Sequence, residues 1–305
     1  MMKANTLSQS QMPTEKRRKP VKASRTVVFI ILLIYAICLF LPFYIVIVTS
    51  LTSKAQFDAT TKFIAFPKIS FEPYKLLFSK DMKTDITGGI PSIFVGFFNT
   101  LWMTLVPLII GLIVSGLSAY AFTKLKYPGQ NLVFRIAYVI SLVPLGAFGV
   151  ISYLFFDTIG WTGSPLPLIV PGMFGSMGIV FFLKMYFEGI PNELLEAAKV
   201  DGMNAIKIYF KIVMPLALPA FIAQFLFGFV SGYNNYLGPS LYLQNASVKF
   251  FSISLQLVLV DAQNMYGQQT VTCAAAIIGL LPLVIIYAIF QRFFIEGIAM
   301  GGVKE

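Results

Sequence analysis

The ionisable residues that could take part in chemistry are concentrated in one stretch, residues 189–219, of an otherwise apolar chain. Glu193, Glu196 and Asp201 supply carboxylates there, and three lysines lie among and after them. The chain contains no histidine, so the commonest acid–base and metal-binding side chain is missing. We therefore interpret the stretch as a surface that a partner molecule binds, and not as a catalytic centre.

The first half of this stretch predicts a short helix. Pro191 is tolerated in a first helical turn, and Glu193 and Glu196 then lie near the positive end of the helix dipole. Gly202 ends the helix, as glycine often does in the left-handed conformation. The expected apolar face consists of Leu194, Ala197 and Ala198.

A second amphipathic helix is predicted after Gly202. Asn204 is suited to cap its first turn. Met214 and Pro215 are expected to stop it, which leaves two short helices hinged at a glycine. Its apolar stripe repeats at i, i+3, i+4 and i+7 through Ile206, Tyr209, Phe210 and Val213.

The sequence lacks the residue sets of common enzymes and of ATP-binding proteins. It has no G-x-x-x-x-G-K-[ST] phosphate loop, no Ser/His/Asp set and no Cys/His cluster, so energy must come from outside the chain. Cys38 and Cys273 lie in apolar runs, which supports neither a disulfide nor a metal site. The predicted spans contain almost no charge; Arg135 and Lys184 lie near inner ends. Ion-coupled carriers normally need ionisable groups in mid-membrane, so this pattern argues against one.

A membrane domain must position these groups. Apolar residues make up 57% of the chain, charged residues 12%, and the mean hydropathy is +0.79, values typical of a polytopic membrane protein. We expect an all-α polytopic membrane protein with six transmembrane helices. Apolar runs of spanning length lie at residues 27–48, 93–122, 132–156, 168–187, 216–236 and 271–294.

The distribution of basic residues orients these spans. Lys and Arg residues are dense before the first span, and most of the 23 fall on the side that also carries residues 189–215. Under the positive-inside rule that side is cytoplasmic, and so are both termini. We expect residues 1–25 to be a disordered basic N-terminus and residues 26–305 a single transmembrane domain with a cytoplasmic tail over 295–305.

The sequence EAAKVDG at residues 196–202, followed after nine residues by Ile212-Val213-Met214-Pro215, closely resembles the EAA loop of ABC-importer permeases. Met214 is the one departure, since the family pattern prefers Leu. The resemblance implies a type I ABC-importer permease fold in which residues 189–215 form the coupling loop that docks on an ATPase subunit. The positions it marks for ATPase coupling are Glu193, Glu196, Ala197, Ala198, Asp201, Gly202, Ile212 and Pro215.

Other segments resemble the carbohydrate type of this family, such as the smaller membrane subunit of maltose-class importers. AYAFTKLKYPGQ at residues 119–130 is similar to its short cytoplasmic turn, and FGFVSGYNNYLGPSL at 227–241 to its fifth-span signature. The tail EGIAMGGVKE resembles its Gly-rich, Val-Lys ending. This implies that Gly302, Val303 and Lys304 reach the ATPase interface.

Five residues are candidates for a sugar path. Aromatic faces stack on sugar rings and amides pair with hydroxyls, which suits the outer end of the fifth span. The alternative is that these residues are interfacial-belt aromatics and amides that join helices. The candidates are Asn99, Trp102, Tyr233, Asn234 and Asn235.

The resemblance implies the permease subunit of an ATP-driven importer for a carbohydrate, with an oligosaccharide expected from the family group. Its partners would be a second homologous permease, two ATPase subunits that bind ATP and Mg, and an extracytoplasmic sugar-binding protein, all at a bacterial cell membrane. This chain itself would hold no cofactor and bind no nucleic acid. A secondary carrier and a polytopic membrane enzyme are the rival classes; the first needs mid-membrane charges and the second a catalytic constellation.

Overall fold

The computed structural model of the 305-residue chain describes residues 22–59, 68–79, 91–143, 149–243 and 269–302. Regular structure in these residues is helical apart from an isolated bridge at Pro91. The chain divides into two units, residues 1–45 and residues 46–305, which are considered separately.

The first unit contains most of α1, Lys22–Ser50, whose apolar run from Arg25 onward is long enough to cross a membrane. The span predicted at residues 27–48 is therefore confirmed as a helix. The helix begins at Lys22, so residues 22–25, which composition assigned to the disordered N-terminus, are helical. Residues 1–21 lie outside the described residues.

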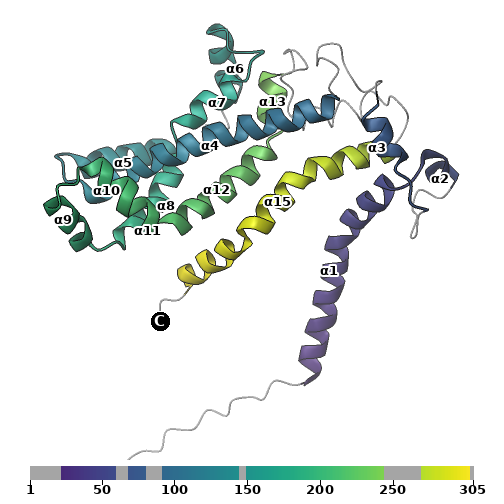
Figure 1. Cartoon of the computed structure of the whole chain (residues 1–305), viewed down its shortest axis with the longest axis horizontal. Helices are drawn as coiled ribbons and strands as arrows, with labels where there is room; N and C mark the ends of the chain where they lie inside the picture. Colours follow the sequence, from purple (N-terminus) through teal and green to yellow (C-terminus); the bar gives the residue numbers. More distant parts are fainter. Residues whose placement is uncertain (1–21, 60–67, 80–90, 144–148, 244–268, 303–305) are drawn as a thin grey trace, which may run out of the picture. The chain divides into compact units, whose positions relative to one another are not determined.

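The second unit is built around α4, Ser92–Lys124, which confirms the span predicted at 93–122 (Figure 1). It packs against α7, Leu166–Met173, against α8, Met177–Glu188, and against α12, Leu218–Tyr233.

Between them α7 and α8 make the span predicted at 168–187, but the span is broken at Gly175, whose φ is +81°.

The break is set by close backbone contact. The backbones of Gly111, Gly172 and Gly175 meet so closely that a Cβ at Gly111 would overlap the Gly172 carbonyl oxygen. Ser115 accepts a hydrogen bond from the Ser176 amide at 3.1 Å. Small residues on α4 thus allow the two backbones to approach closely at these positions.

A second cluster of buried residues joins α12 to α15, Gln269–Gly302, and to the short α3, Glu72–Leu77. Its members Leu77, Ile93 and Phe229 are essentially inaccessible to solvent. Helix α15 continues past the predicted end of the sixth span at Phe294, and Val303 and Lys304 lie outside the described residues. The short α2 spans Lys54–Ala59.

The described residues contain four helices that are long and apolar enough to cross a membrane, or five when one bent pair is included. The bent pair is Ala205–Leu216 with Leu218–Tyr233, and it turns by 78°. Residues of the third predicted span, 132–156, form two shorter helices, α5, Gln130–Ser141, and α6, Gly149–Thr158, and neither is among the spanning helices; residues 144–148 between them lie outside the described residues. The all-helical membrane fold is confirmed.

Candidate functional site

The charged stretch forms α9, Asn192–Val200, with Pro191 immediately before it and Glu193 in its first turn. One face of α9 is buried through Leu195 and Ala198. The predicted apolar face is confirmed at Ala198 and wrong at Leu194 and Ala197, which are exposed, while Leu195 is buried instead. The contacts of α9 with the rest of the unit decide which apolar residues turn inward.

Helix α9 ends in a glycine turn, as predicted. Gly202 has a φ of +78°, its amide donates to the Lys199 carbonyl at 3.0 Å, and the Met203 amide donates to the Ala198 carbonyl at 3.0 Å. Asn204 then caps the next helix, its side chain accepting from the Lys207 amide at 2.9 Å. The hinge between the two short helices is thus fixed by local hydrogen bonds.

The second helix does not stop at Met214-Pro215 as predicted. The chain runs through α10, Ala205–Ile208, a π-helical turn at Tyr209–Val213, labelled η4, and α11, Met214–Leu216. A proline at the start of a helical segment needs no amide donor, so Pro215 is accommodated. The sharp bend comes at Ala217, because Pro219 cannot donate the next backbone hydrogen bond.

The apolar stripe predicted for this helix is confirmed only in part. Tyr209 and Val213 are fully buried, together with Ile208, which the pattern did not include. Ile206 and Phe210 are exposed. The π-helical turn changes the angular spacing after Ile208, so a stripe drawn at 3.6 residues per turn fails there.

Both ends of the segment 189–215 are fastened to α4. Lys124 Nζ, in the last turn of α4, donates to the Ile190 carbonyl at 2.6 Å and to Asn192 Oδ1 at 2.9 Å. At the other end, the Tyr209 hydroxyl donates to the Ile113 carbonyl at 3.4 Å. These bonds join parts of the chain that lie far apart in the sequence.

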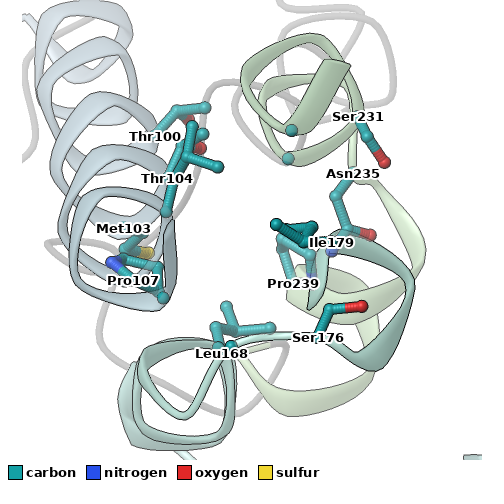
Figure 2. A pocket seen from close by; sticks show the side chains of 16 residues that line it. Thr100, Met103, Thr104, Pro107, Leu168, Ser176, Ile179, Ser231, Asn235 and Pro239 are labelled. Carbon is teal, nitrogen blue, oxygen red and sulfur yellow. The ribbon is translucent and has the colours of Figure 1, made fainter. Parts of the chain in front are cut away.

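A cavity of about 310 Å³ opens between α4, α7, α8, α12 and α13, Leu237–Tyr242. Figure 2 shows Thr104, Leu168 and Ile179 pointing toward the same open space. Among the described residues that line the cavity, none is charged. The polar side chains of the lining are those of Thr100, Thr104, Ser176, Ser231 and Asn235.

Of the five residues predicted for a sugar path, only Asn235 lines this cavity. Tyr233 is buried, and its hydroxyl donates to the Gly279 carbonyl of α15 at 2.8 Å, so it packs α12 against α15. The Asn234 amide turns back to the Val230 carbonyl. Asn99 accepts a hydrogen bond from the Trp102 indole at 3.1 Å, on the side of α4 away from the cavity lining.

The sequence reasoning missed the contribution of α4 to the cavity. Thr100, Thr104, Pro107 and Gly111 lie at steps of three and four residues within an otherwise apolar span. This spacing puts them on one helix face, and it was available in the sequence. Ser176 was also missed, because only the broken span brings it to the cavity.

No metal-binding arrangement is found within the described ranges, where no three His, Cys, Asp or Glu side chains lie close together. The charged groups of the segment 189–215, among them Glu193 and Glu196, are exposed. The two candidate regions therefore differ in character. The cavity is uncharged and lies between helices, whereas the charged stretch faces outward.

Comparison with known proteins gives one family. The family described as "Binding-protein-dependent transport system inner membrane component" matches residues 108–299. The chain is 32% identical over 245 residues to the arabinooligosaccharides transport system permease protein AraQ of Bacillus subtilis, which covers 78% of this chain and 80% of AraQ. It is 28% identical over 291 residues to the melibiose/raffinose/stachyose import permease protein MelC of the same species, covering 93% of this chain and all of MelC.

A solved structure has a similar fold. One chain of a bacterial ABC transporter involved in the import of the acidic polysaccharide alginate superposes with a TM-score of 0.74. The alignment covers 91% of this chain and 99% of that chain at 22% identity. Identity at this level speaks for the fold and not for the substrate.

Proposed function

This chain belongs to the family of binding-protein-dependent transport system inner membrane components and is a permease subunit of a carbohydrate ABC importer, and from this premise we propose that residues 189–215 couple it to the ATPase subunits. ATP is bound by those partner subunits and not by this chain. The proposal gives the charged stretch its role: the surface of α9 that faces away from the permease is where an ATPase subunit docks.

The composition of that surface supports docking. We define the docking face as the exposed residues Glu193, Leu194, Glu196, Ala197 and Val200 of α9. Val200 is 89% exposed and Leu194 47% exposed, so the face presents apolar side chains beside carboxylates. Exposed apolar groups rimmed by charge are typical of protein–protein contacts.

We further propose that the cavity admits a neutral oligosaccharide. Its hydroxyl and amide groups match the donors and acceptors of sugar hydroxyls, and Met103, Leu168 and Ile179 offer apolar contact. A carboxylate or phosphate held in such a site needs a paired cation, and the described lining offers none. This uncharged polar lining is the observation that carries the proposal. It agrees with the neutral sugars in the names of AraQ and MelC.

The assembly we propose has two permeases, two ATPase subunits and an extracytoplasmic sugar-binding protein. The fold supports six spans with both termini cytoplasmic if α5 and α6 form one interrupted span. In this arrangement α9 and Lys126 face the cytoplasm. The tail around Gly302 is expected at the ATPase interface, as the sequence predicts.

The experiment is uptake by membrane vesicles that contain the whole importer. We expect labelled arabinotriose or raffinose to enter, and digalacturonate neither to enter nor to compete. Thr104→Val keeps the side-chain shape but removes the hydroxyl, and it should lower uptake roughly two- to tenfold, the worth of one hydrogen bond. Ser118→Ala is the matched control, because Ser118 lies on α4 outside the cavity lining. Uptake of digalacturonate, or unchanged uptake by Thr104→Val, contradicts the proposal.

A further inference from the structure

Lys124 makes a connection that the sequence reasoning did not anticipate. It is the last residue of α4, and its ammonium group donates to Ile190 O and to Asn192 Oδ1. Its partners lie 66 and 68 residues further along the chain. A single side chain thus ties the end of α4 to the point where α8 gives way to α9.

The position of these acceptors explains why a lysine is useful there. Ile190 and Asn192 flank Pro191, which has no amide to donate, at the turn between α8 and α9. The carboxylates of Glu188 and Glu193 are close enough to Lys124 to interact electrostatically with it. Glu188 also pairs with Lys184 one turn earlier, so Lys124 lies in a small network of charges. The ammonium group fixes the direction in which α9 leaves the bundle.

The far end of the coupling segment is fixed to the same helix. Tyr209 is fully buried, donates to Ile113 O, and lies against the Tyr120 ring with centroids 5.7 Å apart. Gly116 makes room for it, because a Cβ there would overlap the Tyr209 hydroxyl. The segment between Lys124's acceptors and Tyr209 therefore begins and ends on α4.

Helix α4 extends from these contacts to the cavity. It is unbroken from Ser92 to Lys124, and its outer part supplies Thr100, Met103 and Thr104 to the cavity lining. At 1.5 Å per residue, about 30 Å separates the levels of Thr104 and Lys124. Figure 1 shows α4 running from the end that carries α9 and α10 toward α3.

We propose that Lys124 is a positioning residue that transmits movement of α9 to α4, and through α4 to the wall of the cavity. The inference rests on the proposed docking of α9 on an ATPase subunit. Without Lys124, α9 can shift on its buried face while α4 stays in place. The ATPase cycle then continues, but the cavity no longer responds to it.

The test follows the cavity directly and needs no knowledge of the sugar. In the assembled importer, Cys38 and Cys273 are replaced by Ser, and Thr104 is replaced by Cys. The rate at which a methanethiosulfonate reagent labels this cysteine is measured without nucleotide and again in the ATP–vanadate state. The quantity measured is the ratio of the two labelling rates. Lys124→Met keeps the length of the side chain and removes its donors. We expect it to reduce the nucleotide dependence of labelling at least threefold, with Lys124→Arg retaining it. Lys126→Met, at an exposed lysine two residues on, is the matched control and should also retain it.

The proposal is overturned if Lys124→Met keeps the full response, or if Lys124→Arg and Lys126→Met lose it equally. Should Lys124→Met fail to assemble, Asn192→Ala removes one of the two acceptors, and an unchanged response in that variant also overturns the proposal. A different measurement tests the docking of α9 on the ATPase subunit. If that docking proposal is wrong, the loaded binding protein will still stimulate ATP hydrolysis by the Glu196→Ala importer.

Discussion

At Gly202, backbone strain and side-chain size predict opposite orders for the harm done by substitution with Ala and with Asn. Its φ of +78° is left-handed, and a Cβ added there would meet no heavy atom within 4 Å. A substitution therefore adds backbone strain but no overlap within this chain. Left-handed backbone costs most L-residues about 1–2 kcal/mol, and Asn less, since its side chain tolerates that conformation. We expect Gly202→Ala to reduce the population of the native turn, relative to competing conformations, by roughly five- to thirtyfold. Gly202→Asn should reduce that population by less.

The assay is ATP hydrolysis by the reconstituted importer, stimulated by loaded binding protein, with hydrogen exchange of the amides of residues 198–204 in parallel. Stimulation and amide protection should decline in the order Gly, Asn, Ala at position 202. Gly189→Ala is the control, because Gly189 lies at the other end of the segment with an ordinary φ of −74°. If Asn at position 202 is more harmful than Ala, size at the docked surface governs the effect and the conformational reasoning is refuted.

Three further predictions concern contacts described above. Glu196→Ala should leave insertion intact and lower stimulated ATP hydrolysis about tenfold or more, because a charge-assisted bond to a partner is worth about 1.5–3 kcal/mol; wild-type stimulation in assembled importer would contradict it. Gly116→Ala should lower stability in detergent by about 1–3 kcal/mol through overpacking. Gly178→Ala should not, because a Cβ there meets only a 3.6 Å contact. Equal melting temperatures of the two variants would refute the packing account. Tyr233→Phe should cost about 0.5–1.5 kcal/mol of stability through loss of the bond to α15 without changing which sugars enter, and a changed substrate preference would return Tyr233 to the sugar path.

The parts of the site that depend on local chemistry could be predicted from the sequence. Pro191 before α9, the glycine turn at Gly202 and the Asn204 cap each follow from the residue itself and its nearest neighbours. The membrane class and most of the helices also follow, since apolar runs of spanning length are read directly. Local rules were sufficient wherever the partner of a group lies within a few residues of it.

The parts that depend on distant contacts could not be predicted in the same way. Leu195 is buried where Leu194 was expected, because packing against α10 and within a shared buried cluster sets the rotation of α9. Asn235 and not Asn234 reaches the cavity, since α12 has ended and the chain turns toward α13. Lys124 looked like an ordinary cytoplasmic lysine because its acceptors are more than sixty residues away.

The meeting of Gly111 with Gly172 and Gly175 has a mechanical consequence. The contact is made by backbone and by two small side chains, Pro107 beside Gly172 and Ser115 beside Gly175, so few side chains would have to rearrange if the segment between α7 and α8 turned against α4 here. Nearer α9, α8 and α4 are held together by buried bulky residues such as Phe187 and by the Lys124 bonds. We therefore expect the contact between these segments to be uneven in stiffness, with its most compliant point at the edge of the cavity.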